Sequence, residues 1–186
     1  MNKIIVILIC IFQLAILNSR GQTHRSVAES FLNLLNKYEK DSLKIVTSDD
    51  FHLEEGYVRR SIDKAEFIDS FVSFSKIVNG KFNIVRKIEG PELFVFLVED
   101  VSDYITYFDL KAPIWKLTIV TNKGLVTKMI SDTTKGYQAY LNKFLIKHEN
   151  FIKWLNSKYP NETEDYLYHD ITGLLNRRLK EFSSLQ

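Results

Sequence analysis

The densest group of polar side chains lies in one short segment and consists of Asp49, Asp50, His52, Glu54 and Glu55. A carboxylate beside an imidazole can carry out acid–base chemistry if both groups face one cavity. His52 and Glu54 are two residues apart, so on a strand they share a face. That face is either the interior of the fold or the solvent, and a solvated face is the simpler explanation. The two aspartates are typical of a turn and a helix cap.

A second group combines aromatic rings with one acid and consists of Tyr104, Tyr107, Asp109 and Trp115. The pattern predicts a strand over 104–110, on which Tyr107 and Asp109 share a face. Enclosure among aromatic rings would raise the pKa of Asp109, so this residue could then donate a proton. Packing and cross-strand pairing are the alternative explanation of the same aromatic residues.

The remaining histidines form no pattern of metal ligands. His24 lies near the N-terminus, His148 lies on the apolar stripe of a predicted helix, and His169 has no partner at ligand spacing. The sequence also lacks the HExxH, GxGxxG, GxSxG and P-loop patterns. We therefore expect no metal site, no nucleotide site and no cofactor.

The first 21 residues have the pattern of a signal peptide. Lys3 precedes an apolar run over 4–17, which is shorter than the ~20 residues that span a bilayer. Small residues at Ser19 and Gly21 fit cleavage before Gln22. We expect export to the periplasm or the cell exterior after this cleavage, with no stable membrane span afterwards.

The charge balance and the cysteine content of the chain after residue 21 exclude several kinds of partner and site. Two of the 25 basic residues lie in the first 21 positions and no acidic residue does, so cleavage leaves 23 acidic residues and as many basic ones. This neutral balance, without a Lys/Arg-rich run, argues against a nucleic-acid partner. The only cysteine, Cys10, lies within the apolar run and does not fit a lipoprotein site. Its removal leaves no disulfide, thiol nucleophile or zinc–thiolate site.

The elements that must position these side chains follow from hydrophobic period and capping signals. In the first half, Ser26 with Glu29 and Asp63 with Glu66 form two capping boxes, each of which begins a helix. The predicted elements are helices over 26–40, 41–46 and 63–77, a turn over 47–50 and a strand over 51–58.

From residue 81 the period changes to two. The predicted strands are 81–88, 93–98, 104–110, 114–121 and 125–131. The strand over 93–98 is continuously apolar, which predicts cover on both faces. A loop over 122–124 joins the last two strands, and Gly124 supplies the positive φ that such a hairpin needs. Helices are predicted over 136–158, from a cap at Asn161, and over 174–182.

Segregated helices and antiparallel strands indicate an α+β fold. The element order resembles the nuclear transport factor 2-like superfamily, which includes ketosteroid isomerase, scytalone dehydratase and polyketide cyclases. The resemblance rests on the helix Val27–Lys40, the segment from Val46 to Phe51 and the hairpin over 114–131. It implies a curved antiparallel sheet wrapped as a cone around N-terminal helices. We expect this domain over 22–133, with a helical extension over 134–186 packed on the same domain.

The resemblance also implies where a ligand would lie, because the mouth of this cone is lined by aromatic and a few polar groups. The candidate pocket residues are Tyr107, Asp109 and Trp115, followed by His52 and Glu54. The family's catalytic residues cannot be matched one by one, so no catalytic role is carried over.

Three functions stay open at this stage. The first is an exported binding module for a small apolar or aromatic ligand or a protein partner. The second is a small cofactor-free isomerase, dehydratase or hydrolase, and the third is a structural protein with a filled cone. A cavity of ~300 Å³ or more favours the first two, and a cone plugged by Phe94, Phe96 and Trp115 favours the third. The aromatic C-terminal helices either pack across the sheet or cap the cone, or they form a surface for a partner protein or a homodimer.

Overall fold

The structure, a computed structural model, describes residues 27–89 and 93–185. The predicted signal peptide and His24 lie outside the described residues. The chain is mixed α+β, as the sequence predicts, and its elements are a helix over 27–36, α2 (Lys40–Val46), β1 (Thr47–Glu55), β2 (Arg60–Asp63), α3 (Lys64–Glu66), a π-helical turn (Phe67–Phe71), α4 (Val72–Ile77), β3 (Lys81–Glu89), β4 (Leu93–Val101), α5 (Asp103–Tyr107), β5 (Ile114–Asn122), β6 (Leu125–Thr133), α6 (Tyr137–Lys158), α7 (Glu164–His169) and α8 (Leu174–Ser183).

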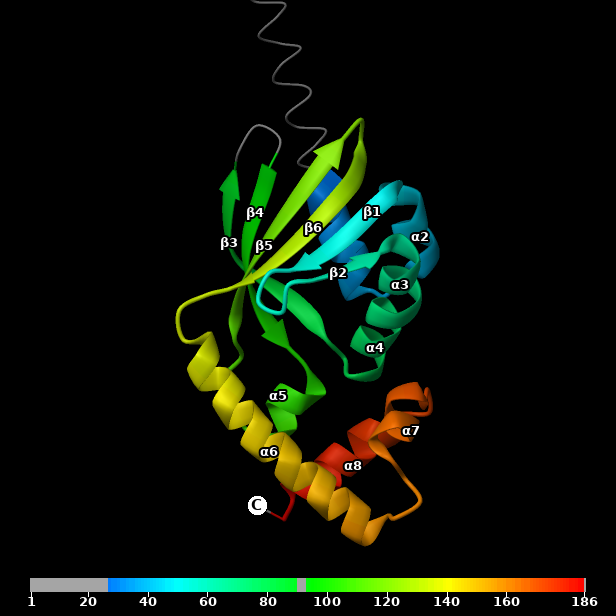
Figure 1. Ribbon diagram of the computed structural model, residues 1–186, viewed down its shortest axis with the longest axis vertical. Helices are drawn as coiled ribbons and strands as arrows, with labels where there is room; N and C mark the ends of the chain where they lie inside the picture. The colour runs from blue at the N-terminus through cyan, green and yellow to red at the C-terminus, as the bar shows by residue number, and fades with distance from the viewer. Residues whose placement is uncertain (1–26, 90–92, 186) are drawn as a thin grey trace, which may run out of the picture.

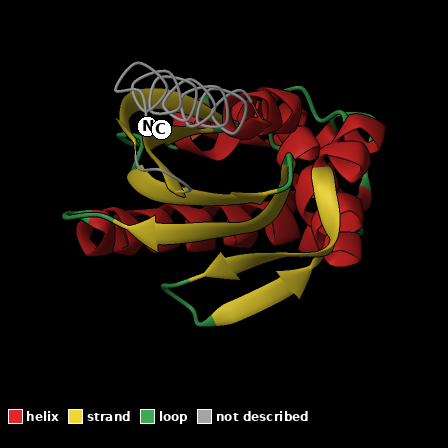
Figure 2. Ribbon diagram, turned by 90° about the horizontal axis from the view of Figure 1, so that it is seen from above, coloured by secondary structure: helices red, strands yellow, loops and turns green. Residues whose placement is uncertain are grey.

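One six-stranded sheet, in the order β2-β1-β6-β5-β4-β3, forms the framework. All neighbours are antiparallel except β1 and β6, which run parallel. The register shifts once within each of β1, β3 and β5, and such irregularities bend and twist a sheet. Figure 1 shows the sheet with the N-terminal helices on one side and α6–α8 gathered at one end, and Figure 2 shows the bend of the sheet.

Two apolar clusters hold this arrangement together. The first lies between the inner face of the sheet and the N-terminal helices, where Phe31, Phe51 and Phe67 pack with ring centroids 4.9–6.0 Å apart. The second lies under the C-terminal helices, where Phe108 and Phe151 are fully buried. The aromatic stripe of α6 therefore packs largely inside the molecule.

Several local predictions are confirmed. Asp63 caps the helix at residue 64 by accepting a hydrogen bond from the Glu66 amide at 2.8 Å. The hairpin over 114–133 forms with Lys123 and Gly124 both at positive φ. Its loop is therefore a two-residue turn of the type that matches strand twist, one residue shorter than predicted.

The predicted strand over 104–110 is wrong, because α5 covers Asp103–Tyr107 and a turn follows over 108–109. Ser102 caps α5 by accepting from the Ile105 amide. Tyr104 and Phe108 are both buried, and their spacing of four places them on one helical face. The aromatic content of the segment favoured a strand locally, whereas contact with the C-terminal helices selects the helix.

The start of β1 corrects a second prediction, since residues 47–50 are strand and not turn. Thr47 pairs with Val126 of β6, and its hydroxyl donates to the Leu43 carbonyl at 2.7 Å. The strand ends at Glu55, and the edge strand β2 that follows was not predicted.

Two further predictions are wrong in detail. In β4, Phe94, Phe96 and Val98 are buried, but Leu93 is 49% exposed, so only one face is fully covered. Near the C-terminus, Thr163 caps α7 in place of Asn161.

Candidate functional site

A cavity of about 650 Å³ lies between the inner face of the sheet and the helices. Its wall comes from all six strands, from the helix over 27–36, from α3 and the π-helical turn, and from α4–α7. Ligand pockets commonly have volumes of roughly 300–1,000 Å³ and mostly apolar walls with a few polar groups. The cone is therefore open, and its volume is ordinary for a site that holds a small organic molecule.

Three polar side chains face the cavity because they lie on the same side of their strands as the buried apolar residues. Glu55, Asp100 and Ser131 line the cavity, and each comes two residues after a buried apolar residue on the same strand, namely Leu53, Val98 and Met129. Glu55 and Ser131 are also direct neighbours across β1 and β6. Each strand thus changes from apolar core to polar wall as it leaves the first cluster.

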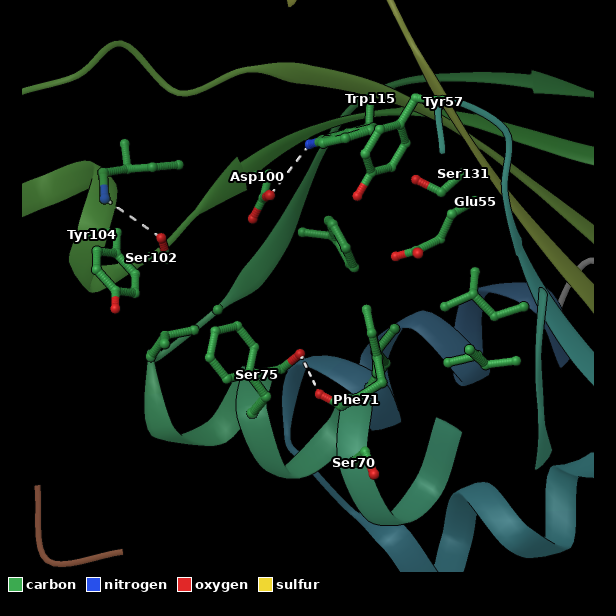
Figure 3. A pocket seen from close by; sticks show the side chains of 18 of the residues that line it. Glu55, Tyr57, Ser70, Phe71, Ser75, Asp100, Ser102, Tyr104, Trp115 and Ser131 are labelled. Atoms are coloured by element: carbon green, nitrogen blue, oxygen red, sulfur yellow. Dashed lines mark hydrogen bonds between the residues drawn. The ribbon is translucent and has the colours of Figure 1, made fainter. Parts of the chain in front are cut away.

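Asp100 is the most enclosed acid of the cavity. Its carboxylate accepts a hydrogen bond from Trp115 Nε1 at 3.2 Å, and Figure 3 shows this pair at the cavity wall. Burial raises the pKa of Asp100 to about 6, and the bond from Trp115 only partly opposes this rise. Among the described residues, Trp115 is the only side chain that hydrogen-bonds the carboxyl group. Asp100 is thus an acid that changes charge near neutral pH.

Aromatic rings and a second acid lie close to Asp100. The rings of Tyr57 and Trp115 are 5.1 Å apart, and Tyr137 packs behind both at 5.6 and 4.8 Å. Burial raises the pKa of Tyr57 to about 12 and raises the pKa of Glu55, although Arg60 partly opposes the effect on Glu55. Figure 3 shows Glu55, Tyr57 and Ser131 grouped on one side of the cavity.

A different polar group closes the end of the cavity toward the C-terminal helices. Tyr104 donates to the Tyr168 hydroxyl at 3.0 Å, and Tyr168 in turn donates to Glu164. His148 Nε2 lies 3.0 Å from Glu164 Oε1 and 3.3 Å from the Tyr168 hydroxyl. Burial raises the pKa of both tyrosines. These groups are paired with one another, so they position α5, α6 and α7 at this end of the cavity.

Of the first three predicted pocket residues, only Trp115 lines the cavity. Tyr107 is partly buried at the end of α5 and packs against the second apolar cluster. Asp109 follows it at a φ of 51° with an exposed side chain. The enclosure on which the predicted proton-donor role of Asp109 depends is therefore missing.

His52 and Glu54 lie on the outer face of β1, opposite Phe51 and Leu53, as the predicted parity requires. His52 Nε2 is 3.2 Å from Glu54 Oε1, and Lys128 Nζ is 2.9 Å from the same oxygen. The hydrogen bond from Lys128 is the largest cause that lowers the pKa of Glu54. Neither His52 nor Glu54 is among the residues that line the cavity.

Sequence reasoning missed Asp100 as a site residue and passed over Glu55, although a signal for both was present. The alternation of Phe94, Phe96 and Val98 extends by one more step to Asp100. Because the run from 93 to 98 is continuously apolar, this alternation is hard to see. In the same way, Phe51 and Leu53 lead to Glu55 on the inner face.

Neither a metal-binding cluster nor a membrane-spanning helix is present in the part of the chain that the structure describes. No three His, Cys, Asp or Glu side chains in this part of the chain converge as a metal site. No helix over 27–89 or 93–185 is both long and apolar enough to cross a membrane.

No protein-family model and no curated protein matches the sequence. Solved structures do match. A candidate SnoaL-like polyketide cyclase from Shewanella denitrificans has a TM-score of 0.54 and 15% identity, over 66% of this chain and 96% of that chain. A second candidate SnoaL-like polyketide cyclase, from Shewanella putrefaciens, has a TM-score of 0.52 and 13% identity, over 66% of this chain and 86% of that chain. A candidate ketosteroid isomerase from Kribbella flavida has a TM-score of 0.50 and 12% identity, over 62% of this chain and 80% of that chain.

These identities are too low to carry an activity from one protein to another, because one fold hosts many functions. What the matched chains share with this one is the architecture, and about a third of this chain lies outside each match. The expected curved sheet with helices is confirmed, and the chain has the nuclear transport factor 2-like fold that its element order resembles.

Proposed function

We propose that this chain binds a small organic ligand with an apolar or aromatic body in the cavity of the cone. The observation that carries the proposal is the open volume of about 650 Å³ beside Asp100. Aromatic walls provide apolar contact, and one or two polar groups fix the orientation of a ligand. Phe94 and Phe96 are buried in the first apolar cluster and leave this volume free, which counts against a structural protein with a filled cone.

Binding of prodan, a neutral naphthalene fluorophore, tests the proposal. Its emission should shift to the blue and rise when it enters the cavity. Ser131→Phe places a ring in the cavity wall and should remove this signal. Lys116→Phe adds the same ring at an exposed position of the neighbouring strand and should leave it unchanged. Equal signals from the two variants, both with native circular dichroism, would locate the dye elsewhere and contradict the proposal.

A second candidate function is cofactor-free acid–base catalysis, and the observation that favours it is Asp100. A general acid or base works best when its pKa lies near the operating pH, and the pKa of Asp100 is about 6. The test is deuterium exchange, in D₂O, at the methyl group of 2-acetylnaphthalene. Catalysis by Asp100 predicts exchange that rises around pH 6 and is lost in Asp100→Asn. Exchange no faster than in buffer would contradict catalysis and leave ligand binding as the only proposed function.

Export belongs to the proposal and rests on the sequence pattern of residues 1–21. N-terminal sequencing of protein from its native host should begin near Gln22. An intact Met1 in the soluble protein would contradict export by a cleaved signal.

A further inference from the structure

The charged groups on the cavity wall are mostly acidic. The wall carries Glu55, Glu66 and Asp100 against a single arginine, Arg60, and it contains no lysine among the described residues. Arg60 is half-exposed and forms an ion pair with Glu66. His148, the other basic group of the wall, is held by Glu164 at the opposite end of the cavity. Arg60 also lies across from Glu55 and partly offsets its charge, whereas no cation of the wall acts on Asp100.

Protein atoms enclose most of the Asp100 carboxyl group, and the surface that it keeps faces the cavity. Its hydrogen bond from Trp115 uses one oxygen, Oδ2. A buried carboxylate with a single neutral donor is costly, because it has lost water without gaining a charge partner. Near neutral pH, above its pKa of about 6, the group is mostly ionised. A ligand that brings a positive charge would offset this cost, whereas an anionic ligand would increase it.

Aromatic rings supply a second attraction for a cation at the same place. Trp115, Tyr57 and Tyr140 all line the cavity, and the Tyr57 and Trp115 rings are 5.1 Å apart. Ring faces attract ammonium groups, and this attraction is strongest when water is excluded. Figure 3 shows the Tyr57 and Trp115 rings side by side, with Asp100 and Glu55 on either side of them.

We propose that the ligand of this cavity is an organic amine cation, with its charged nitrogen near Asp100 and Glu55 and against the rings of Tyr57 and Trp115. Its apolar body extends along Phe71 and Phe74, which line the same cavity from the continuous helical segment over 64–77. This inference rests on the proposed function, since it names the chemical class of the molecule that the cone holds.

The test compares three probes of similar size and different charge in the full chain. Benzyltrimethylammonium is the cation, neopentylbenzene is its uncharged carbon isostere, and benzenesulfonate is an anion. Trp115 and Trp154 are the two tryptophans of the chain, so Trp154→Phe leaves Trp115 as the only tryptophan fluorophore. In this background at pH 7.5 we expect the cation to bind at least about tenfold more tightly than the isostere, and the anion more weakly than both.

Asp100→Asn should weaken the preference for the cation, because only Glu55 and the ring faces still attract its charge, and should leave the affinity for the isostere nearly unchanged. Glu54→Gln removes an acid from the outer face and serves as the matched control, with the preference retained. An isostere or anion that binds as tightly as the cation would overturn the amine proposal and leave the binding site itself standing. Failure of all three probes, together with failure of prodan, would overturn the proposed function as well.

Discussion

Glu54 and Glu55 are adjacent on β1, yet their surroundings are opposite. Glu54 lies on the outer face with His52 and Lys128, and its pKa is lowered mainly by the hydrogen bond from Lys128. Glu55 faces the cavity, and burial raises its pKa. The outer face satisfies its charges with exposed partners, whereas the inner face keeps its acids in a partly dry space. Strand parity alone therefore decides which acids are available to a ligand.

The same contrast holds across the sheet. On β5, Leu117 and Ile119 of the inner face are fully buried, while Lys116 of the outer face is exposed. On β4, the inner face runs from Phe94 to Asp100, the acid with the largest enclosure in the cavity. The inner face is thus a continuous surface that changes from hydrophobic core to binding wall.

The largest expected effect comes from a core position of the inner face. Ile119→Ala should lower the free energy of unfolding by about 2–5 kcal/mol, because Ile119 is fully buried and the change leaves a cavity. Lys116→Ala, three residues away on the outer face, should change it by no more than about 0.5 kcal/mol. Urea denaturation of both variants checks this, and equal losses would show that the inner and outer faces are wrongly assigned.

The next largest effect is expected from Asp100→Asn, which should raise the free energy of unfolding by an amount that depends on pH. The pKa of Asp100 is raised from 3.8 to about 6 in the folded state, so the folded protein holds the proton more tightly than the unfolded chain. Stability from this group is therefore fully present below pH ~4 and is lost as pH rises through about 6.

Asp100→Asn removes that loss. The raised pKa corresponds to about 3 kcal/mol, so the variant should be more stable than the wild type by up to this amount at pH 8 and by little at pH 4. Urea denaturation at the two pH values measures the difference. A variant that is less stable at pH 8 would show that the carboxylate is satisfied by partners and is not held at a cost.

The smallest effect is expected on the outer face. Lys128→Met breaks the ion pair with Glu54, whose side chain is 38% exposed. Exposed pairs contribute at most about 1 kcal/mol, so the free energy of unfolding should fall by less than that in urea denaturation. Adding 0.5 M salt should reduce the difference further. A loss above about 2 kcal/mol would mean that this network supports the core and would weaken the contrast between the faces.

Much of the fold could be predicted from the sequence because its signals are local. Capping at Asp63, the turn at Gly124 and the helical period over 136–158 each depend on neighbouring residues and are confirmed. The segment 104–110 could not be predicted in this way, since contacts with α6 and α8 decide its conformation. Local aromatic content favoured the wrong element there.

The candidate site was only partly predictable for a related reason. Trp115 was identified by its type, but Asp109 depended on the strand that does not form. Asp100 follows Glu99 at the end of an apolar strand, and two adjacent acids there have the pattern of a solvated strand end. The cavity that it lines is walled in part by α5 and α6, which come later in the chain.

The most direct test of the enclosed inner face is the pKa of Asp100 itself. Carbon-13 NMR can follow the Asp100 carboxyl carbon from pH 3 to pH 9, with Asp100→Asn used to assign its signal. An enclosed carboxyl group with Trp115 as its single donor predicts a midpoint near pH 6. A midpoint near the ~3.9 of a free aspartate would show that water or a cation already satisfies the group and would contradict the assignment of Asp100 as the polar anchor of the cavity.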